Sequence, residues 1–210
     1  MSLTVSIIPV TPFGQNCALV YNPETKQGAV IDPGGDVPKI AAAIAKAGVT
    51  VTDIFLTHGH LDHAGGAAAL AKALGVKITG PALPDKFLLD SIVIQGQMFG
   101  IRGENCAPDA WLAEGDAVTI GGENFEVLLC PGHTPGHVVF VNKASKFGIF
   151  GDVLFRNSVG RTDFPYGDTA ALIGAIKEKL LVLPDDFAFI CGHGEGSTIG
   201  AEKRSNPFIR

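Results

Sequence analysis

"FLTHGHLDHAGG", residues 55–66, places three of the chain's six histidines and one aspartate within six positions. The apolar run before it predicts a buried strand, and the alanine-rich run after it predicts a helix. Alternate residues of a strand point to the same side, so His58 and His60 can face one ion together. Asp62 and His63 follow where the chain turns into the helix, and they point elsewhere, towards a second ion. One turn of the chain therefore offers ligands for two metal sites.

Four ligands cannot complete two sites, so other parts of the chain must contribute. His133 lies in the Pro/Gly turn of "CPGHTPGHVVF", Asp152 ends a strand in "IFGDVLF", and His193 ends another in "FICGHG". A single histidine more often packs in a core or lies on a surface, and Asp152 alone would cap a turn. Their joint occurrence at strand ends, where sheets gather binding groups, favours metal binding instead. His137 opens a strand, and we expect it to pack or to support a ligand.

The composition predicts a soluble globular protein. With 210 residues, 46% of them hydrophobic, the chain can fill one sizeable core. A net charge of −5 and 18% charged residues argue against a nucleic-acid partner. No apolar run approaches the ~20 residues of a membrane span, and the start of the chain lacks the features of a signal peptide. We therefore expect a cytoplasmic protein that does not interact with a membrane.

The chain contains four cysteines: Cys17, Cys106, Cys130 and Cys191. They are scattered and form no C-x-x-C pair, which argues against a disulfide framework or a zinc knuckle. We expect reduced thiols that pack in the interior.

The order of predicted elements indicates two similar halves. In the first half we expect strands at 3–10, 16–22, 28–35 and 52–58, with helices at 37–47 and 64–75. Residues 78–113 have an irregular pattern, and 95–111 are typical of a long surface loop. In the second half we expect strands at 117–122, 124–130, 137–142, 146–152 and 186–194, with a helix at 169–183. This order predicts two mixed sheets packed against each other, each covered by helices on its outer side.

The H-x-H-x-D-H signature, followed in order by His133, Asp152 and His193, resembles the metallo-β-lactamase superfamily. The resemblance covers nearly the whole chain. It implies an α/β fold, a four-layer αβ/βα sandwich with metals between the sheet edges. It also implies one domain over residues 1–210, without a separate C-terminal helical domain.

The same resemblance implies a ligand set for two divalent metal ions. The first ion would be held by His58, His60 and His133, and the second by Asp62, His63 and His193, with Asp152 bridging the two. Zinc is the first choice for such imidazole and carboxylate ligands, and iron and manganese are alternatives. True β-lactamases of this fold place a cysteine at the point of the bridging carboxylate, so we do not expect antibiotic hydrolysis.

Two further segments, "GDVLFRNSVGRTDFPYGD" (151–168) and "GSTIGAEKRSNPFIR" (196–210), resemble hydroxyacylglutathione hydrolases, also called glyoxalase II, in their short bacterial form. The resemblance implies an enzyme that cleaves the thioester of S-2-hydroxyacylglutathione, such as S-lactoylglutathione, by a hydroxide that bridges the metals. Asp62 would orient that hydroxide. The glutathione thioester is thus the expected small-molecule partner, whereas the oligomeric state is left open.

Arg161 has two interpretations. It holds the position of a basic residue that binds glutathione in the long enzymes, and it can equally form a salt bridge to Asp163 or Asp168. Other features of the long enzymes are absent: they insert helices before the segment that resembles 196–210, and two of their glutathione-binding tyrosines correspond here to Asp163 and Glu195. The hydrolytic centre is therefore better supported than the thiol that it would recognise.

"GRTDF" (160–164) also resembles persulfide dioxygenases of the same fold, which oxidise glutathione persulfide with oxygen. In those enzymes one iron is held by residues that correspond to His58, His133 and Asp152. A third interpretation keeps the hydrolytic centre but gives it a lactone or another ester. Nuclease members of the superfamily add basic elements that this acidic chain lacks.

Overall fold

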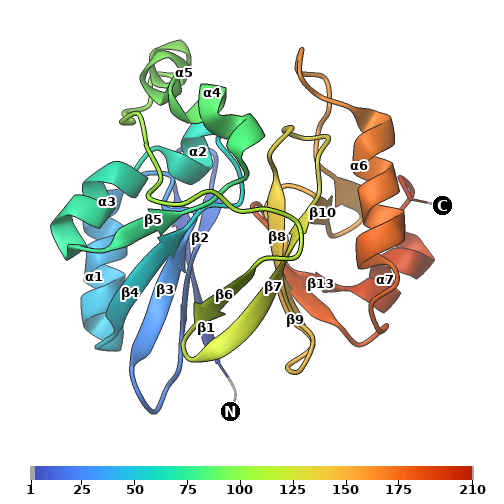
Figure 1. Cartoon of the computed structure of the whole chain (residues 1–210), viewed down its shortest axis with the longest axis horizontal. Coiled ribbons are helices and arrows are strands. Elements are labelled where there is room, and N and C mark those ends of the chain that lie inside the picture. The colour runs from blue at the N-terminus through green and yellow to red at the C-terminus, as the bar shows by residue number, and fades with distance from the viewer. Residues whose placement is uncertain (1–2, 210) are drawn as a thin grey trace.

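The computed structural model describes residues 3–209 and shows two sheets packed face to face, with helices on the two outer sides (Figure 1). This arrangement is the four-layer αβ/βα sandwich predicted from the sequence. Residues 1, 2 and 210, which belong to the predicted 1–210 domain and its C-terminal segment, lie outside the described part of the chain.

The N-terminal half builds a five-stranded sheet in the order β1-β2-β3-β4-β5. Its strands are β1 (Thr4–Val10), β2 (Gln15–Tyr21), β3 (Gln27–Ile31), β4 (Thr50–Phe55) and β5 (Lys77–Thr79). Helices α1 (Val37–Ala47) and α3 (Ala67–Leu74) cover its outer face (Figure 1). Both helices end at a glycine in the left-handed region, where a residue without Cβ is least strained.

The C-terminal half builds a six-stranded sheet in the order β13-β12-β9-β8-β7-β6. Its strands are β6 (Ala117–Ile120), β7 (Glu123–Leu129), β8 (Val138–Asn142), β9 (Phe147–Ile149), β12 (Ala188–Ile190) and β13 (Ser197–Thr198). The outer face is covered by α6 (Thr169–Ala175), its π-helical continuation η2 (Ile176–Leu180) and α7 (Ile199–Ser205). The short strands β10 (Leu154–Phe155) and β11 (Ser158–Val159) pair separately.

Both faces of each sheet are buried, because alternate residues of a strand point to opposite faces. In β2, Leu19 joins the core beneath α1, whereas Val20 joins the core between the sheets. In β8, Phe140 lies between the sheets and Val141 packs in the core beneath α6. This burial on two sides explains why the strands read as nearly continuous apolar runs. All four cysteines are free and buried, as predicted.

Parallel pairing brings the predicted ligand loops to one edge of the sandwich. β3, β4 and β5 pair in parallel, and so do β9 and β12, so their carboxyl ends lie together. Residues 58–63 follow β4, Asp152 follows β9, and His193 follows β12. An isolated bridge between Gln15 and His193 joins the two halves at this edge.

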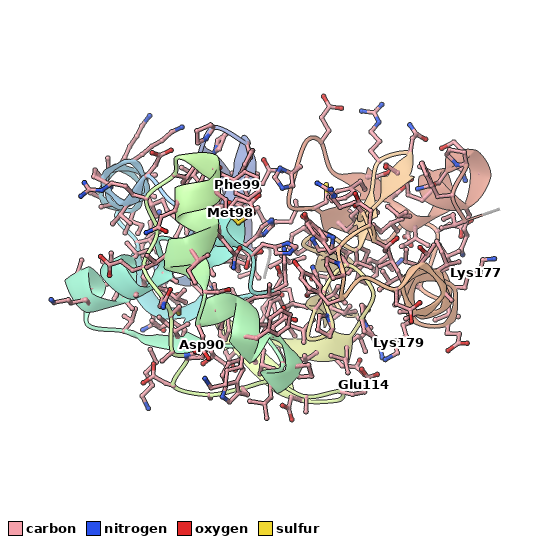
Figure 2. All side chains as sticks on the ribbon, turned by 90° about the horizontal axis from the view of Figure 1, so that it is seen from above. Asp90, Met98, Phe99, Glu114, Lys177 and Lys179 are labelled. Carbon is pink, nitrogen blue, oxygen red and sulfur yellow. The ribbon has the colours of Figure 1, made fainter. Side chains whose placement is uncertain are left out.

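The region 78–113 corrects the prediction of an irregular segment. It contains the 3-10 turn η1 (Leu83–Asp85) and the helices α4 (Lys86–Leu89) and α5 (Ile92–Phe99), which lie across the ligand-bearing end of the sheets (Figures 1 and 2). The predicted surface loop at 95–111 is wrong for residues 95–99, which belong to α5, whereas residues 100–111 contain no helix. Apolar residues lie on all sides of α5 and hide its periodicity. Ile92 is buried, whereas Ile94 and Met98 are 60% and 75% exposed. No helix within residues 3–209 is long and apolar enough to cross a bilayer.

Candidate metal centre

The seven ligands predicted from the sequence converge where the two sheets meet. His58 and His60 follow β4, while Asp62 and His63 belong to the single helical turn α2 (Leu61–Ala64). The other three ligands come from the second half: His133 from the turn between β7 and β8, Asp152 from the loop after β9, and His193 from the loop after β12. We call these seven side chains the metal centre.

Three imidazoles form the first group of the metal centre. Nε2 of His58 lies 3.1 Å from Nδ1 of His60, which lies 3.0 Å from Nε2 of His133. Oδ2 of Asp152 is 3.5 Å from the same nitrogen of His133. Tetrahedral bonds of about 2.0–2.1 Å to one zinc ion would separate neighbouring ligand atoms by roughly 3.3 Å. The observed separations therefore suit one shared cation.

The second group contains two imidazoles and two carboxylates. Nε2 of His63 lies 3.8 Å from Oδ2 of Asp62 and 3.4 Å from Oδ1 of Asp152. Nε2 of His193 lies 3.2 Å from Oδ2 of Asp62 and 3.6 Å from Oδ2 of Asp152. Asp152 thus contacts histidines of both groups, which is the position that a bridging carboxylate requires.

Asp32 and Thr57 determine which nitrogen of two rings faces the centre. The Thr57 hydroxyl donates to Oδ2 of Asp32 at 2.6 Å, so it accepts the hydrogen bond from Nδ1 of His58 at 3.0 Å. Nδ1 of His63 also donates to Asp32, at 3.0 Å. Because both Nδ1 atoms carry a hydrogen, Nε2 is the nitrogen of each ring that can bind a metal ion.

The other two rings of the first group are oriented from the second half of the chain. Nδ1 of His133 donates to the carbonyl oxygen of Arg161 at 2.8 Å. Nε2 of His60 is 2.8 Å from the hydroxyl of Tyr166, which can accept its hydrogen. Nε2 of His133 and Nδ1 of His60 therefore face the centre as acceptors. Each imidazole of this group is held on one side and open to a cation on the other.

Several donor atoms of the metal centre have no partner among the protein's own side chains, and a divalent cation would supply one. Nε2 of His63 and Oδ1 of Asp152 are buried and make no hydrogen bond. The facing nitrogens of His58, His60 and His133 direct lone pairs at one another across 3.0–3.1 Å, which is repulsive without a positive charge between them. A cation between these atoms would satisfy all of them.

The pKa shifts describe the same balance of charge. Burial lowers the pKa of His58 far below its usual value and that of His60 to about 3, so both rings are neutral and able to bind metal. Burial alone would raise the pKa of Asp152, but His63 and His133 hold it well below its usual range. Burial lowers the pKa of His63, yet Asp152 and Asp62 raise it well above the ordinary value. The carboxylates of Asp62 and Asp152 thus favour a positive charge in the second group.

Asp32 is a supporting residue that the sequence motifs did not identify. It lies just after β3 with a positive φ of 51°, and it is buried. Besides its bonds to Thr57 Oγ1 and His63, it accepts the backbone N–H of Thr57 at 2.7 Å. Its oxygens are therefore already satisfied, so we read it as a support and not as a third metal site. Its place at a strand end, in "DPGGD", is the signal that could have revealed it.

Asp85 joins the two loops that carry most of the first group. Its carboxylate accepts hydrogen bonds from Gly59 N at 2.8 Å, from Thr134 Oγ1 at 2.7 Å and from Gly136 N at 2.6 Å. Burial raises its pKa to about 6, although these three bonds act in the opposite direction. It lies in the region with no regular sequence pattern, so no sequence motif marks it.

His137 supports the centre from behind, as its position at a strand start suggested. Its Nε2 accepts the backbone N–H of Asp152 at 3.0 Å, and its ring stacks on His58 with centroids 4.5 Å apart. It therefore positions one candidate ligand and packs against another.

Arg161 forms the predicted salt bridge and contacts no candidate ligand with its side chain. Its Nε and Nη2 donate to the two oxygens of Asp163 at 2.6 and 2.7 Å, and its guanidinium lies 4.5 Å from the ring centre of Phe164. Asp168, the other predicted partner, instead caps α6 by accepting the N–H of Ala171.

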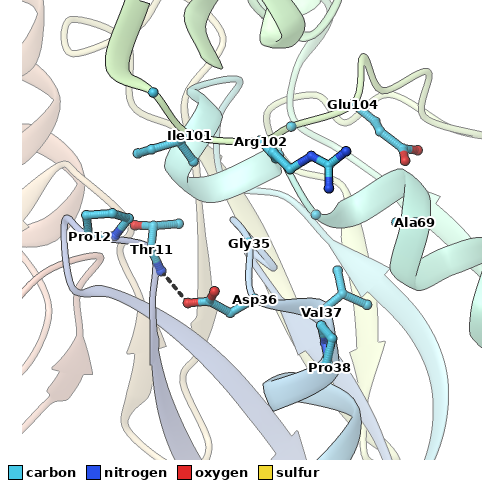
Figure 3. A pocket seen from close by; sticks show the side chains of 14 residues that line it. Thr11, Pro12, Gly35, Asp36, Val37, Pro38, Ala69, Ile101, Arg102 and Glu104 are labelled. Atoms are coloured by element: carbon cyan, nitrogen blue, oxygen red, sulfur yellow. Dashed lines mark hydrogen bonds between the residues drawn. The ribbon is translucent and has the colours of Figure 1, made fainter. Parts of the chain in front are cut away.

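A separate cavity of about 760 Å³ opens beside the start of α1. Its wall includes Thr11, Asp36 and Arg102, and none of the seven side chains of the metal centre lines it. Figure 3 shows the bond that closes one side of it, from Thr11 N to the Asp36 carboxylate at 2.9 Å. This cavity is distinct from the metal centre.

Comparisons with known proteins match the whole fold. Residues 10–193 match the family model described as metallo-beta-lactamase superfamily. The hydroxyacylglutathione hydrolase GloC of Haemophilus influenzae is 47% identical over 209 residues, which cover 99% of this chain and 98% of that protein.

Two crystal structures are similar over nearly their full length. The BLEG-1 B3 metallo-β-lactamase has a TM-score of 0.90 at 32% identity, covering 98% of this chain and 99% of that one. TTHA1623 in a di-iron-bound form has a TM-score of 0.88 at 36% identity, covering 97% and 100%. Because one of these proteins is named a β-lactamase, the exclusion of antibiotic hydrolysis stays a prediction.

Proposed function

The chain belongs to the metallo-β-lactamase superfamily, and from this premise we propose that it is a metal-dependent hydrolase of S-2-hydroxyacylglutathione thioesters. We infer the substrate from the 47% identity to a hydroxyacylglutathione hydrolase over nearly the whole of both chains. The metal centre supports the reaction class, because its donors suit two divalent cations.

We assign the first cation to His58, His60 and His133, the second to Asp62, His63 and His193, and the bridging position to Asp152. When bound, such a pair supplies a Lewis acid for the thioester carbonyl and a water acidified towards neutral pH. Zinc is our first assignment for both positions, with iron or manganese as alternatives, and TTHA1623 has been crystallised with two irons.

Asp62 orients the attacking water in this proposal. Its Oδ2 lies 3.2 Å from Nε2 of His193, and in the proposal its other oxygen accepts a hydrogen from that water. Asp32, Asp85 and His137 hold the surrounding loops and rings in place. The leaving thiol needs little help from an acid, because a thiol with a pKa of about 8.5 departs readily as thiolate. The sequence also offers Arg161 as a contact to glutathione, but its guanidinium is paired with Asp163, so we propose the ion-pair interpretation for it.

Metal analysis run beside a thioester assay tests the proposal. Protein purified without added metal should contain close to two divalent ions per chain and should hydrolyse S-lactoylglutathione, with a known hydroxyacylglutathione hydrolase as the positive control. One iron per chain together with oxygen uptake on glutathione persulfide would replace the hydrolase by the dioxygenase that the sequence also resembles. Hydrolysis of a β-lactam in preference to the thioester would move the chain towards the BLEG-1 enzyme.

A further inference from the structure

Three aromatic side chains stand in a row beside the first group of the metal centre. The rings of Phe164 and Tyr166 are stacked with centroids 5.3 Å apart and planes 10° from parallel. Phe87 of α4 meets Tyr166 edge to face at 5.2 Å. We call Phe87, Phe164 and Tyr166 the aromatic wall; it joins the β11–α6 loop to the helix that covers the ligand-bearing edge.

The aromatic wall is continuous with the metal centre. The ring of Phe164 lies 4.9 Å from that of His60 and 5.8 Å from that of His133. The hydroxyl of Tyr166 contacts His60 at 2.8 Å. A molecule with its reacting carbon at the first group would therefore have the wall beside it.

The wall carries no net charge. Arg161, which lies over the outer face of Phe164, is neutralised by its two bonds to Asp163. A tyrosine hydroxyl such as that of Tyr166 is uncharged at neutral pH. Phe87 is 45% exposed, and the neighbouring Leu83 is 56% exposed, so apolar surface continues outward from the wall. Exposed apolar surface beside a reactive centre is typical of a ligand-binding site.

The surroundings of His193 are more polar, although the ring of Phe155 lies 6.4 Å from that of His193. Arg156 and Glu195 form an ion pair close to it, and both side chains are more than half exposed. Asn16 adds a polar side chain, which donates to the carbonyl of Gly194 at 2.8 Å. Three aromatic rings thus lie beside the first group, whereas mainly polar side chains accompany Phe155 beside His193.

A 2-hydroxyacylglutathione has the same division. Its thiol part is a peptide with two carboxylates, and its acyl part is the only portion that can be apolar. Resting on the function proposed above, we propose that the aromatic wall is the acyl subsite and that it selects thioesters whose acyl group carries a large apolar or aromatic substituent.

Paired substrates test this assignment. S-lactoylglutathione and S-mandeloylglutathione share the thiol and the 2-hydroxyl and differ only in methyl against phenyl. We expect Phe87→Ala to reduce the ratio of kcat/KM for mandeloyl over lactoyl at least about fivefold, because an aromatic contact is lost for the phenyl group alone. Phe87→Trp should retain the ratio. Phe208→Ala, which removes a phenylalanine that is 55% exposed near the C-terminus, is the matched control and should also retain it.

The outcomes separate this subsite from the proposed function. If both thioesters are hydrolysed and Phe87→Ala leaves the ratio unchanged, the acyl subsite is wrong and the hydrolase stands. An equal rise in KM for both thioesters would place glutathione on the wall and would also overturn the assignment. If metal-loaded wild type hydrolyses neither thioester, the proposed function is lost and the subsite with it. Circular dichroism of each variant distinguishes a lost contact from a lost fold.

Discussion

The metal centre and the aromatic wall are neighbours, but they are built in different ways. In the metal centre, His58, His63 and His133 are almost fully buried, and each ring is held by a hydrogen bond on its outer side. In the wall, Phe87 is 45% exposed and meets the ring of Tyr166 edge to face. Buried polar atoms must be paired, whereas exposed rings can change at little cost. Substitutions in the metal centre should therefore cost more activity than substitutions in the wall.

Loss of a bridging ligand should have the largest effect. We expect Asp152→Ala to lower thioester hydrolysis by more than the about 100-fold typical for an outer support, because both groups of the metal centre lose a donor. Activity and metal content should fall together when both are measured on the same sample. Full activity at full metal content in both Asp152→Ala and His58→Ala would contradict the prediction that substitutions in the metal centre cost more than substitutions in the wall.

Removal of metal should destabilise the fold itself. The facing lone pairs and the carboxylates of the centre repel one another without cations, so a chelator should lower the melting temperature. At metal concentrations of 100 times Kd, the bound ion adds about 2.7 kcal/mol to the free energy of unfolding, or very roughly 5–10 °C for a chain of this size. Differential scanning calorimetry with and without EDTA measures the shift. Asp152→Ala serves as the control that should respond less.

Asp32→Asn tests whether the hydrogen bond that orients the ring of His63 contributes to metal affinity. Asparagine tolerates the left-handed backbone of residue 32 and keeps the shape of the side chain, but it weakens the acceptor for Nδ1 of His63. We expect metal affinity at the second group to fall about 10–100-fold, as measured by competition with a chromophoric chelator. Unchanged affinity in a folded variant would show that the ring of His63 is oriented by packing alone.

Tyr166→Phe tests the one residue that belongs to the wall and also contacts the centre. The phenylalanine keeps the ring stack with Phe164 but removes the acceptor for Nε2 of His60. Because the site is partly exposed and water can replace the hydroxyl, we expect at most about a tenfold loss of metal affinity at the first group, the low end for outer supports. The same chelator competition reads it out. If Tyr166→Phe lowers metal affinity as much as the loss of a candidate ligand does, Tyr166 belongs functionally to the metal centre.

Arg161→Ala should have the smallest effect. Its ion pair with Asp163 is exposed, and such pairs contribute roughly 0–1 kcal/mol to the free energy of unfolding. We expect KM for S-lactoylglutathione to change less than about threefold, because Asp163 already occupies the guanidinium. A tenfold rise in KM at unchanged kcat would instead assign Arg161 to a glutathione carboxylate. Steady-state kinetics at two ionic strengths separates the two results.

The convergence of the seven side chains was largely predictable because the candidate ligands are marked locally. The spacing of His58, His60, Asp62 and His63 indicates two sites from one turn, and the strand-end positions of the remaining ligands follow from Gly- and Pro-bounded apolar runs. The supports were not predictable in this way. Asp85 lies 26 residues from Gly59 and 51 from Gly136, and no local pattern relates these positions. Helix α5 also escaped prediction, because its apolar residues lie on its exposed faces as well as on its buried one.

The sequence by itself determined which side chains are candidate donors and the order of the strands that deliver them. Side-chain chemistry and hydrophobic pattern are local properties, and both can be read from the chain. Only the tertiary structure decided which nitrogen of each imidazole faces the centre, because that choice depends on Asp32, Thr57, Tyr166 and the carbonyl of Arg161. It also decided that Arg161 pairs with Asp163 and that aromatic rings from two segments line one side of the metal centre. Those arrangements depend on packing between distant segments, which sequence spacing does not encode.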